Sequence, residues 1–309
     1  MSSREPGRPY VTVVIPTRGR PQLLGRCVES LLVQEYPRER YDIVVVEDGT
    51  KEGGEVVAKL SQGTSIPIQY IQIPHSGAAT ARNTGMAQAR GDIVAFIDDD
   101  GLAVPGWLAQ LVEALQQDGV GGAGGRVSPE YPDVDLQAGT TEDGELKWTG
   151  FNVDVEGFQG VDHLPGGNMA FWRKPLIEIR GMDTQYTRRG SWREDTDLCV
   201  RLKHHGYHLL YNSKAKILHR AQRWRDPIDR IRPSLVWAMT RDDAYFRAKN
   251  YGWRGVKGAV LAALRDSQRR IVSGFANLFL VFVHLFGWIP GAWLGLRKKD
   301  RQLGSLPQQ

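Results

Sequence analysis

Four short apolar runs, separated from one another by helical patterns, dominate the first hundred residues. β-branched residues are frequent in these runs, as is typical of strands buried on both faces of a parallel sheet. The runs are Val11–Ile15, Asp42–Val46, Ile66–Ile73 and Ile93–Ile97. Between them, helical patterns follow Pro21 and Gly49 and cover Ala78–Ala89. The alternation predicts an α/β fold in which a mostly parallel sheet is flanked by helices.

The patterns beyond residue 100 are weaker. Gly119–Gly124 has the letters of a dinucleotide-binding fingerprint, but it follows a helical pattern, so we interpret it as a helix end and a tight turn. The polar stretch Glu130–Gln159 predicts a long loop or short strands. Gly190–His208 predicts a helix, and Lys214–Leu218 a short strand that ends at His219.

Length and composition indicate a globular protein. A chain of 309 residues corresponds to about two domains, or to one large domain with an appendage. Hydrophobic residues make up 41% and charged residues 24%, which excludes a disordered or fibrous chain. The two cysteines, Cys27 and Cys199, are too few for a disulfide framework or a Cys-ligated zinc site. The chain starts without the pattern of a secretory signal, so we expect a reducing, cytoplasmic setting.

Charge is distributed unevenly along the chain. From Arg247 to the end there are 11 Lys and Arg against 2 Asp and Glu, whereas the preceding residues carry 29 against 33. A nucleic-acid-binding protein would carry its basic patch on the body, so this class is not expected. A mildly acidic body with a basic tail fits an enzyme held at an anionic surface.

Carboxylates follow the apolar runs, at the sheet edge where α/β proteins bind ligands. Asp98, Asp99 and Asp100 come directly after the fourth run. Alternate residues of an extended chain share a face, so Asp98 and Asp100 can converge. Their oxygens suit Mg²⁺ or Mn²⁺ bridged to a diphosphate. The alternative is a solvated acidic turn or a helix N-cap.

Other polar residues have a structural and a functional interpretation. Asp48 is a turn former or an acceptor for a nucleobase or ribose, and Arg82 is a surface residue or a partner of phosphate. Asp195 is a helix cap or a general base aimed at a hydroxyl. His219 is a structural histidine or a third metal ligand.

Six segments appear in the order VTVVIPTRGR, IVVVEDGT, GAATARNTG, VAFIDDD, PGGNMAFWR and REDTDLCVRL. Together they resemble family 2 glycosyltransferases of the GT-A fold, over roughly residues 10–220. The resemblance implies an inverting transfer of one sugar from a UDP-, GDP- or dTDP-linked donor to a hydroxyl of a glycan or lipid-linked acceptor. It also implies a catalytic domain over residues 1–232, followed by a helical region over 233–309.

The resemblance assigns roles to individual residues. The base is Asp195, with Glu194 beside it. The metal, Mg²⁺ or Mn²⁺, is bound by Asp98, Asp100 and His219. Gly167 and Asn168 face the donor sugar, and Trp192 is a candidate to stack on a sugar ring. The nucleotide is expected to contact Pro16, Thr17, Arg18, Asp48, Arg82, Asp98 and Asp99.

Two departures from the family pattern bear on function. Glu47-Asp48 replaces the usual pair of aspartates, but the second carboxylate is kept, so we expect base binding to survive. Gln222-Arg223-Trp224 lacks the two-residue gap of processive synthases, which indicates a non-processive enzyme. The alternatives are a non-catalytic sugar-nucleotide-binding or membrane scaffold and a sugar nucleotidyltransferase. The loop PTRGRPQLL lacks the Gly-rich stretch that the last of these would need.

The tail contains an uncharged segment of 22 residues, from Phe275 to Leu296. Its length is enough to cross a bilayer, but Gly287 and Pro290 interrupt it, and Lys and Arg follow. A spanning helix, an interfacial hairpin and a buried dimerisation helix that forms a homodimer are the alternatives. Length and flanking charge favour attachment to the cytoplasmic face of the membrane, and hence a membrane-adjacent acceptor.

Overall fold

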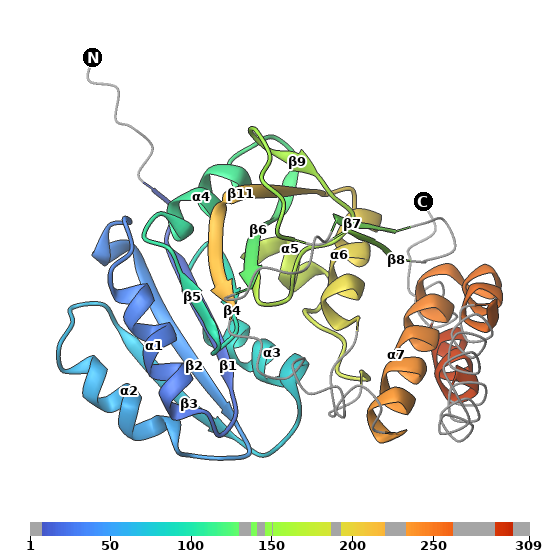
Figure 1. The fold of residues 1–309 in the computed structure, drawn as a ribbon, viewed down its shortest axis with the longest axis horizontal. Helices are drawn as coiled ribbons and strands as arrows, with labels where there is room; N and C mark the ends of the chain where they lie inside the picture. The colour runs from blue at the N-terminus through green and yellow to red at the C-terminus, as the bar shows by residue number, and fades with distance from the viewer. Residues whose placement is uncertain are drawn as a thin grey trace.

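The computed structural model describes residues 8–129, 137–140, 146–149, 151–186, 193–219, 233–261 and 288–298. Within these ranges the main sheet has nine strands, in the order β3-β2-β1-β4-β10-β6-β11-β5, with β9 paired to β11 (Figure 1). The first four strands of this order are parallel and end at one edge. They are β1 (Val11–Thr17), β2 (Tyr41–Asp48), β3 (Ile68–Ile73) and β4 (Ile93–Ile97).

The other half of the sheet is mixed. β10 (Asn168–Trp172) runs antiparallel between β4 and β6 (Val120–Pro129), while β6 is parallel to β11 (His208–His219). β5 (Gly101–Ala103) and β9 (Gln159–Gly160) are antiparallel to β11. β7 (Gln137–Thr140) and β8 (Leu146–Thr149) form a separate pair. The expectation of a mostly parallel sheet therefore holds for β1–β4 but not for this half, because apolar periodicity does not specify strand direction.

Alternation along the strands divides the core into two layers. Val13 and Ile15 belong to the core on the face packed by α1 (Pro21–Leu32), α2 (Gly53–Ser61) and α4 (Trp107–Leu115). Val14 belongs to the core on the other face, with α3 (Ala78–Gln88), α5 (Arg173–Glu178) and α6 (Glu194–His204). A short 3₁₀ turn, η1 (Arg38–Arg40), precedes β2. The helices therefore cover both faces of the sheet and leave the ends of its strands free to carry the site.

The glycine-rich segment after α4 is a strand and not a helix end. Only Gly119, at φ +72°, forms a turn, and the rest lies in β6. A Cβ on Gly121 would lie 2.7 Å from the Cβ of Tyr207, and one on Gly122 would lie 2.6 Å from the Phe171 ring. The glycines are therefore needed for close packing on a core strand, which corrects our interpretation of Gly119–Gly124. The segment is still not a dinucleotide loop.

The C-terminal helices form a separate group beside α6 (Figure 1). α7 (Pro233–Tyr251) is followed by helical segments at 253–261 and 288–298. The last segment packs tightly on α7, since a Cβ on Gly291 would lie 2.0 Å from the carbonyl oxygen of Arg241. Small alanine side chains fill the contact; they are Ala244, Ala248, Ala259 and Ala292.

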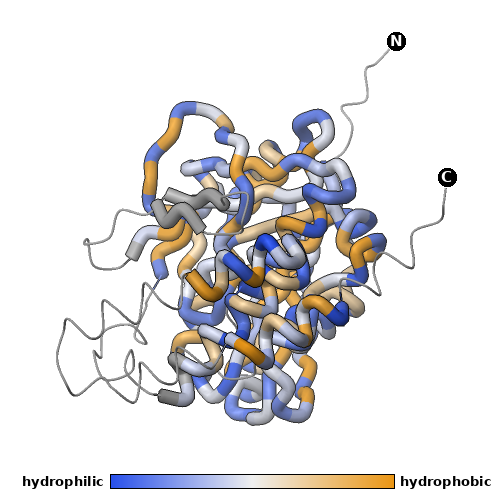
Figure 2. Tube along the Cα trace, turned by 90° about the vertical axis from the view of Figure 1, so that its right-hand side faces the viewer, coloured by the Kyte–Doolittle hydropathy of each residue, from blue (hydrophilic) through white to orange (hydrophobic). Residues whose placement is uncertain are grey.

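The helices of this group carry interspersed polar and apolar residues (Figure 2). Among the helices that the structure describes, none has both the length and the apolar character to cross a membrane. Residues 275–287 of the uncharged segment lie outside the described ranges, and its remaining part is the helix packed on α7. Membrane attachment, dimerisation and the division at residue 232 stay predictions.

Candidate active site

Asp98, Asp100 and His219 converge at the carboxyl edge of the sheet. One ligand atom from each lies within 4.8 Å of the others. The pairing of β5 with β11 sets His219 opposite Gly101, and His219 Nε2 is 3.2 Å from Asp100 Oδ1. The carboxylates converge through a turn rather than along a strand, because β4 ends at Ile97 and the Gly101 N–H donates to the Asp98 carbonyl at 2.9 Å. The expected convergence is thus present, by a different local geometry.

This cluster has the donor set of a divalent cation site. Two carboxylates and one imidazole suit Mn²⁺, and the carboxylates also suit Mg²⁺. Burial raises the pKa of Asp100, but contacts with His219 and Arg20 outweigh it and hold the pKa below the ordinary value. Asp100 is therefore ionised at neutral pH, as a metal ligand must be.

Asp99 points away from the cluster and joins the ends of β1 and β4. It accepts a hydrogen bond from Thr17 Oγ1 at 2.6 Å, and Arg20 Nη2 lies 2.5 Å from its other oxygen. Burial, only partly offset by Arg20, raises the pKa of Asp99 to about 7. Arg20 also donates to Asp100 at 2.9 Å. Sequence reasoning missed Arg20, although its position in the loop after a strand, close to Arg18, was a usable signal.

Asp48 organises the loop before α3. Its two oxygens accept the N–H groups of Ser76 at 2.5 Å and Gly77 at 3.0 Å. His75 Nδ1 lies 2.8 Å from Asp48, and Arg18 Nη1 is 3.2 Å from His75 Nε2. Because Arg can only donate, the ring proton lies on Nδ1. The two predicted nucleotide residues, Arg18 and Asp48, are thus linked through a histidine that the sequence did not single out.

The neighbouring Glu47 is completely buried and ties three segments together. It accepts hydrogen bonds from Thr50 Oγ1, from the Gly53 N–H at 2.8 Å and from Tyr70 Oη at 2.7 Å. Burial alone would raise its pKa, but these donors lower it. Glu47 therefore holds the loop between β2 and α2, and its side chain is used structurally.

Arg82 links the metal cluster to the start of α6. The residue is 4% exposed, and its guanidinium donates to Asp98 Oδ1 at 2.7 Å and to Glu194 Oε1 at 3.1 Å. The pKa of Glu194 is raised to about 8 by burial and by Asp195, against the lowering effect of Arg82. The contacts from Asp98 to Arg82 and from Arg82 to Glu194 therefore fix the position of the metal cluster relative to the start of α6.

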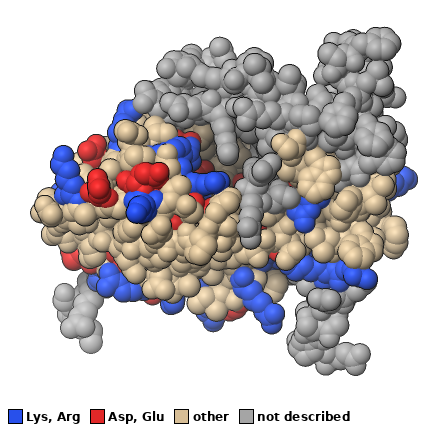
Figure 3. Space-filling view, turned by 90° about the horizontal axis from the view of Figure 1, so that it is seen from below, with Lys and Arg blue, Asp and Glu red and all other residues tan. Residues whose placement is uncertain are grey.

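A two-glycine loop separates Asp195 from Asp98. The Gly166 N–H donates to Asp195 Oδ2 at 3.0 Å, and Asp195 Oδ1 accepts the Thr196 N–H at 2.7 Å. A Cβ on Gly167 would lie 2.7 Å from Asp98 Oδ2. Any side chain here would push one carboxylate out of place, so the loop keeps both facing the same space. Charged side chains of both signs gather around a depression on this face of the molecule (Figure 3).

The remaining predicted residues lie elsewhere. Pro16 is buried within β1. Asn168 is completely buried: it accepts a hydrogen bond from Trp107 Nε1 at 2.7 Å and donates to the carbonyls of Arg126 and Ala215 at 3.1 and 2.9 Å. Its expected contact with the donor sugar has no support in this position. Trp192 and Gln222–Trp224 lie outside the described residues.

The protein thus combines a mixed α/β fold with acidic metal-type ligands at the strand ends and a separate carboxylate on a helix. The family model described as glycosyl transferase family 2 matches residues 12–180, more than half of the chain. The chain therefore belongs to glycosyl transferase family 2, and the predicted family and enzyme class are confirmed. A second model, the N-terminal domain of galactosyltransferase, matches residues 157–223.

Curated relatives carry glycosyltransferase names. The chain is 28% identical over 235 residues to glucosyl-dolichyl phosphate glucuronosyltransferase of Haloferax volcanii, a match that covers 71% of this chain and 72% of that protein. It is 31% identical over 125 residues to glycosyltransferase AglE of the same organism, covering 40% and 41%.

Two solved structures share the fold. Mannosyltransferase PcManGT from Pyrobaculum calidifontis, in complex with GDP-Man and Mn²⁺, matches with a TM-score of 0.58 and 17% identity, over 94% of this chain and 88% of that one. GalNAc-T7 with UDP, GalNAc and Mn²⁺ matches with a TM-score of 0.62 and 14% identity, over 97% and 58%. These similarities confirm the GT-A-like fold.

Proposed function

We propose that this protein is an inverting, divalent-metal-dependent glycosyltransferase that moves one sugar from a nucleotide-sugar donor to a hydroxyl of a glycan or lipid-linked acceptor. The observation that carries the proposal is the arrangement of two sets of carboxylates around the Gly166-Gly167 loop. Asp98 and Asp100 lie on one side with His219, and Asp195 lies on the other.

The two sets of carboxylates have different roles in the proposed reaction. Asp195 takes the proton from the acceptor hydroxyl as that oxygen attacks the anomeric carbon, on the face opposite the leaving diphosphate. Asp98, Asp100 and His219 would hold a divalent cation, which offsets the charge that develops on the leaving group. Arg82 keeps Asp98 and Glu194 in register, and Gly167 leaves room beside Asp98. Two substrates held in line would supply much of the rate enhancement.

A scaffold that only binds a nucleotide sugar is the alternative, and it has no need of a base. The hydrogen bonds from Gly166 and Thr196 to Asp195 orient its carboxylate, which favours the enzyme.

The donor site is tested by thermal stabilisation with UDP, GDP, dTDP and their sugars, each with and without Mn²⁺. We expect one nucleotide to raise the melting temperature, and only when Mn²⁺ is present. A ligand at 100 times its Kd stabilises the folded protein by about 2.7 kcal/mol, so the shift should be measurable. The His219→Ala variant should lose most of the metal-dependent part. If a folded protein shows no shift with any nucleotide, the donor site is wrong and the scaffold alternative falls with it.

We further propose that the C-terminal helices attach the enzyme to the cytoplasmic face of a membrane, close to a lipid-linked acceptor. Large apolar side chains on these helices are exposed, 75% for Trp253 and 56% for Trp293, and the Arg297 guanidinium lies 3.9 Å from the Trp293 ring centre. Tryptophan beside arginine is typical of residues at a bilayer interface.

Co-sedimentation with vesicles tests this attachment. We expect the protein to pellet with vesicles that contain anionic phospholipid and to do so less at high salt. The double variant Trp253→Ser with Trp293→Ser should lose about 100-fold or more in affinity, since each buried apolar side chain contributes about 1.5–3 kcal/mol. Equal pelleting of the wild type and the double variant, or no pelleting of the wild type with these vesicles, would contradict the proposed attachment.

A further inference from the structure

Two residues before the predicted base, Asp195, the backbone has an unusual conformation. Arg193 is the N-cap of α6 and has φ +80°, in the left-handed region that favours glycine. Among the described residues, Arg180 is the other non-glycine residue with positive φ. Such conformations persist only where surrounding contacts hold them, and they are frequent at functional sites. Glu194 and Asp195 follow directly, so this backbone sets the direction in which they leave the loop.

The contacts that hold Arg193 come from α7, fifty residues further along the chain. The guanidinium is buried and donates to Asp243, with Nε at 2.8 Å from Oδ1 and Nη2 also in contact. It lies over the Phe246 ring, at 5.0 Å from the centroid. Arg247 donates to the other oxygen of Asp243 at 2.6 Å and fixes that carboxylate in turn. Residues 243, 246 and 247 lie on one face of α7, and this face is the surface that Arg193 contacts.

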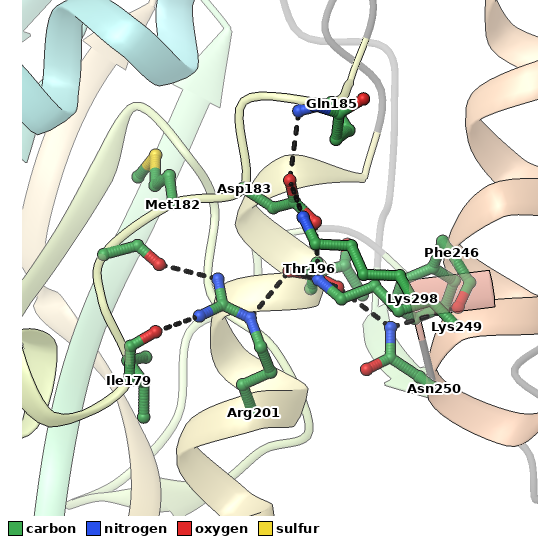
Figure 4. A network of polar contacts seen from close by, with 12 residues as sticks. Ile179, Met182, Asp183, Gln185, Thr196, Arg201, Phe246, Lys249, Asn250 and Lys298 are labelled. Carbon is green, nitrogen blue, oxygen red and sulfur yellow. Dashed lines mark hydrogen bonds and ion pairs between the residues drawn. The ribbon is translucent and has the colours of Figure 1, made fainter. Parts of the chain in front are cut away.

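A second contact from α7 lies on the other side of the pair. Asp197 is completely buried and accepts hydrogen bonds from Lys249 Nζ at 2.7 and 2.8 Å and from Asn250 Nδ2 at 2.9 Å. Figure 4 shows Lys249 and Asn250 reaching from α7 toward the start of α6, near Thr196. Helix α7 therefore holds the chain at Arg193 and at Asp197, with Glu194 and Asp195 between these two points.

We propose that Arg193 is a positioning residue for the base: its ion pair with Asp243 holds the left-handed backbone that aims Asp195 at the acceptor. The inference rests on the proposed function, since it assigns Arg193 a role only through Asp195. It makes α7 part of the catalytic machinery, although no residue of α7 lies in the metal cluster.

Three variants test the proposal, Arg193→Ala, Arg193→Gly and Asp243→Asn, with kcat, donor KM and melting temperature measured on the full chain. Arg193→Ala should lower kcat about 100-fold, as expected for a misplaced catalytic group. Arg193→Gly loses the same side chain but adopts positive φ readily, so its kcat should fall only about tenfold. Donor KM should stay within about twofold, because a change confined to the transition state lowers kcat alone.

If Arg193→Ala does not fold, Asp243→Asn tests the positioning role instead. Asparagine at position 243 keeps the packing and one hydrogen-bond acceptor for Arg193. We expect about a tenfold fall in its kcat, the size of a modest misalignment. Arg180→Ala and Arg180→Gly are the matched controls, with the same backbone preference at an exposed position, and should leave kcat unchanged.

The outcomes separate the two proposals. If Asp195→Asn abolishes transfer while Arg193→Ala and Asp243→Asn keep wild-type kcat, the positioning role is overturned alone. Equal losses of kcat for Arg193→Ala and Arg193→Gly also overturn it, because backbone conformation then does not matter. If Asp195→Asn retains transfer, the base assignment falls, and a loss of kcat at Arg193 can no longer act through Asp195.

Discussion

Asp195→Asn is expected to lower kcat by about 10²–10⁴-fold, the contribution of a general base, and to leave binding of the donor unchanged. Asparagine has nearly the same shape and keeps one acceptor oxygen, so it can retain one of the two hydrogen bonds, from the Gly166 and Thr196 N–H groups, that hold Asp195 now. What it lacks is a site for the proton of the acceptor hydroxyl. The residues of the metal cluster lie across the Gly166-Gly167 loop, so the metal-dependent shift in melting temperature should remain.

Two further variants sharpen this result. Gly166→Ala places a Cβ 2.9 Å from Asp195 Oδ2, which must turn away, and kcat should fall about 100-fold without loss of donor binding. Asp118→Asn, in the exposed turn after α4, removes one carboxylate that is not part of the cluster and should leave kcat and donor binding unchanged. Transfer by Asp195→Asn at more than about a tenth of the wild-type rate would show that another group takes the proton.

The β1–β4 half of the fold was predictable from the sequence because local pattern determines it. A β-branched run buried on both faces has one stable place in an α/β protein, and β4 begins and ends where the run Ile93–Ile97 does. The antiparallel insertion of β10 was not predictable. Its pairing with β4 and β6 joins segments 45 residues or more apart, and no local signal specifies direction.

The same distinction applies to the candidate site. Asp98, Asp100 and His219 were recognisable because strand ends meet at one edge and because the motifs resemble a known family. Asn168 matched the family motif, yet its side chain lies in the core, since a motif gives position along the chain and not the direction of a side chain. The contact of Arg193 with α7 could not be predicted either, because an ion pair between residues far apart in the sequence leaves no periodic pattern.

Lys249→Met is expected to lower the free energy of unfolding by about 3–5 kcal/mol, the cost of breaking a buried ion pair by removing one partner. Lys249 is 3% exposed, and its ammonium group contacts Asp183 at 2.9 Å as well as both oxygens of Asp197. Burial alone would raise the pKa of each carboxyl group, but Lys249 is the largest opposing influence on both. With Lys298 and Tyr245 at Asp183, and with Arg201 at Asp197, it holds both pKa values below normal. Methionine fills the space and leaves two buried carboxylates short of positive charge.

The stability of the variant should depend less on acid pH than that of the wild type. In the wild type both carboxyl groups have depressed pKa values, so their stabilising effect is present at neutral pH and is lost as the pH falls below about 4. In Lys249→Met the largest effect that lowers these two pKa values is lost, so both values rise, while Arg201 still contacts Asp197 and Lys298 still contacts Asp183. The variant should therefore lose less stability than the wild type when the pH falls from 7 to about 3, and urea unfolding of both proteins at the two pH values measures this difference.

Lys298→Met is the matched control for that experiment. Lys298 also contacts Asp183, at 2.7 Å, but its side chain is 36% exposed and Asp183 keeps Lys249 as a partner. Its loss should cost less than about 1 kcal/mol, as for other solvent-accessible ion pairs. Adding Asp197→Asn to Lys249→Met should recover part of the stability, because it removes one of the two buried carboxylates that lost the ammonium group of Lys249 as a partner. Equal losses for the two lysine variants would mean that the contact between α6 and α7 does not depend on the buried ammonium group, and the attachment of α7 would then rest on its apolar contacts and on the Arg193–Asp243 pair.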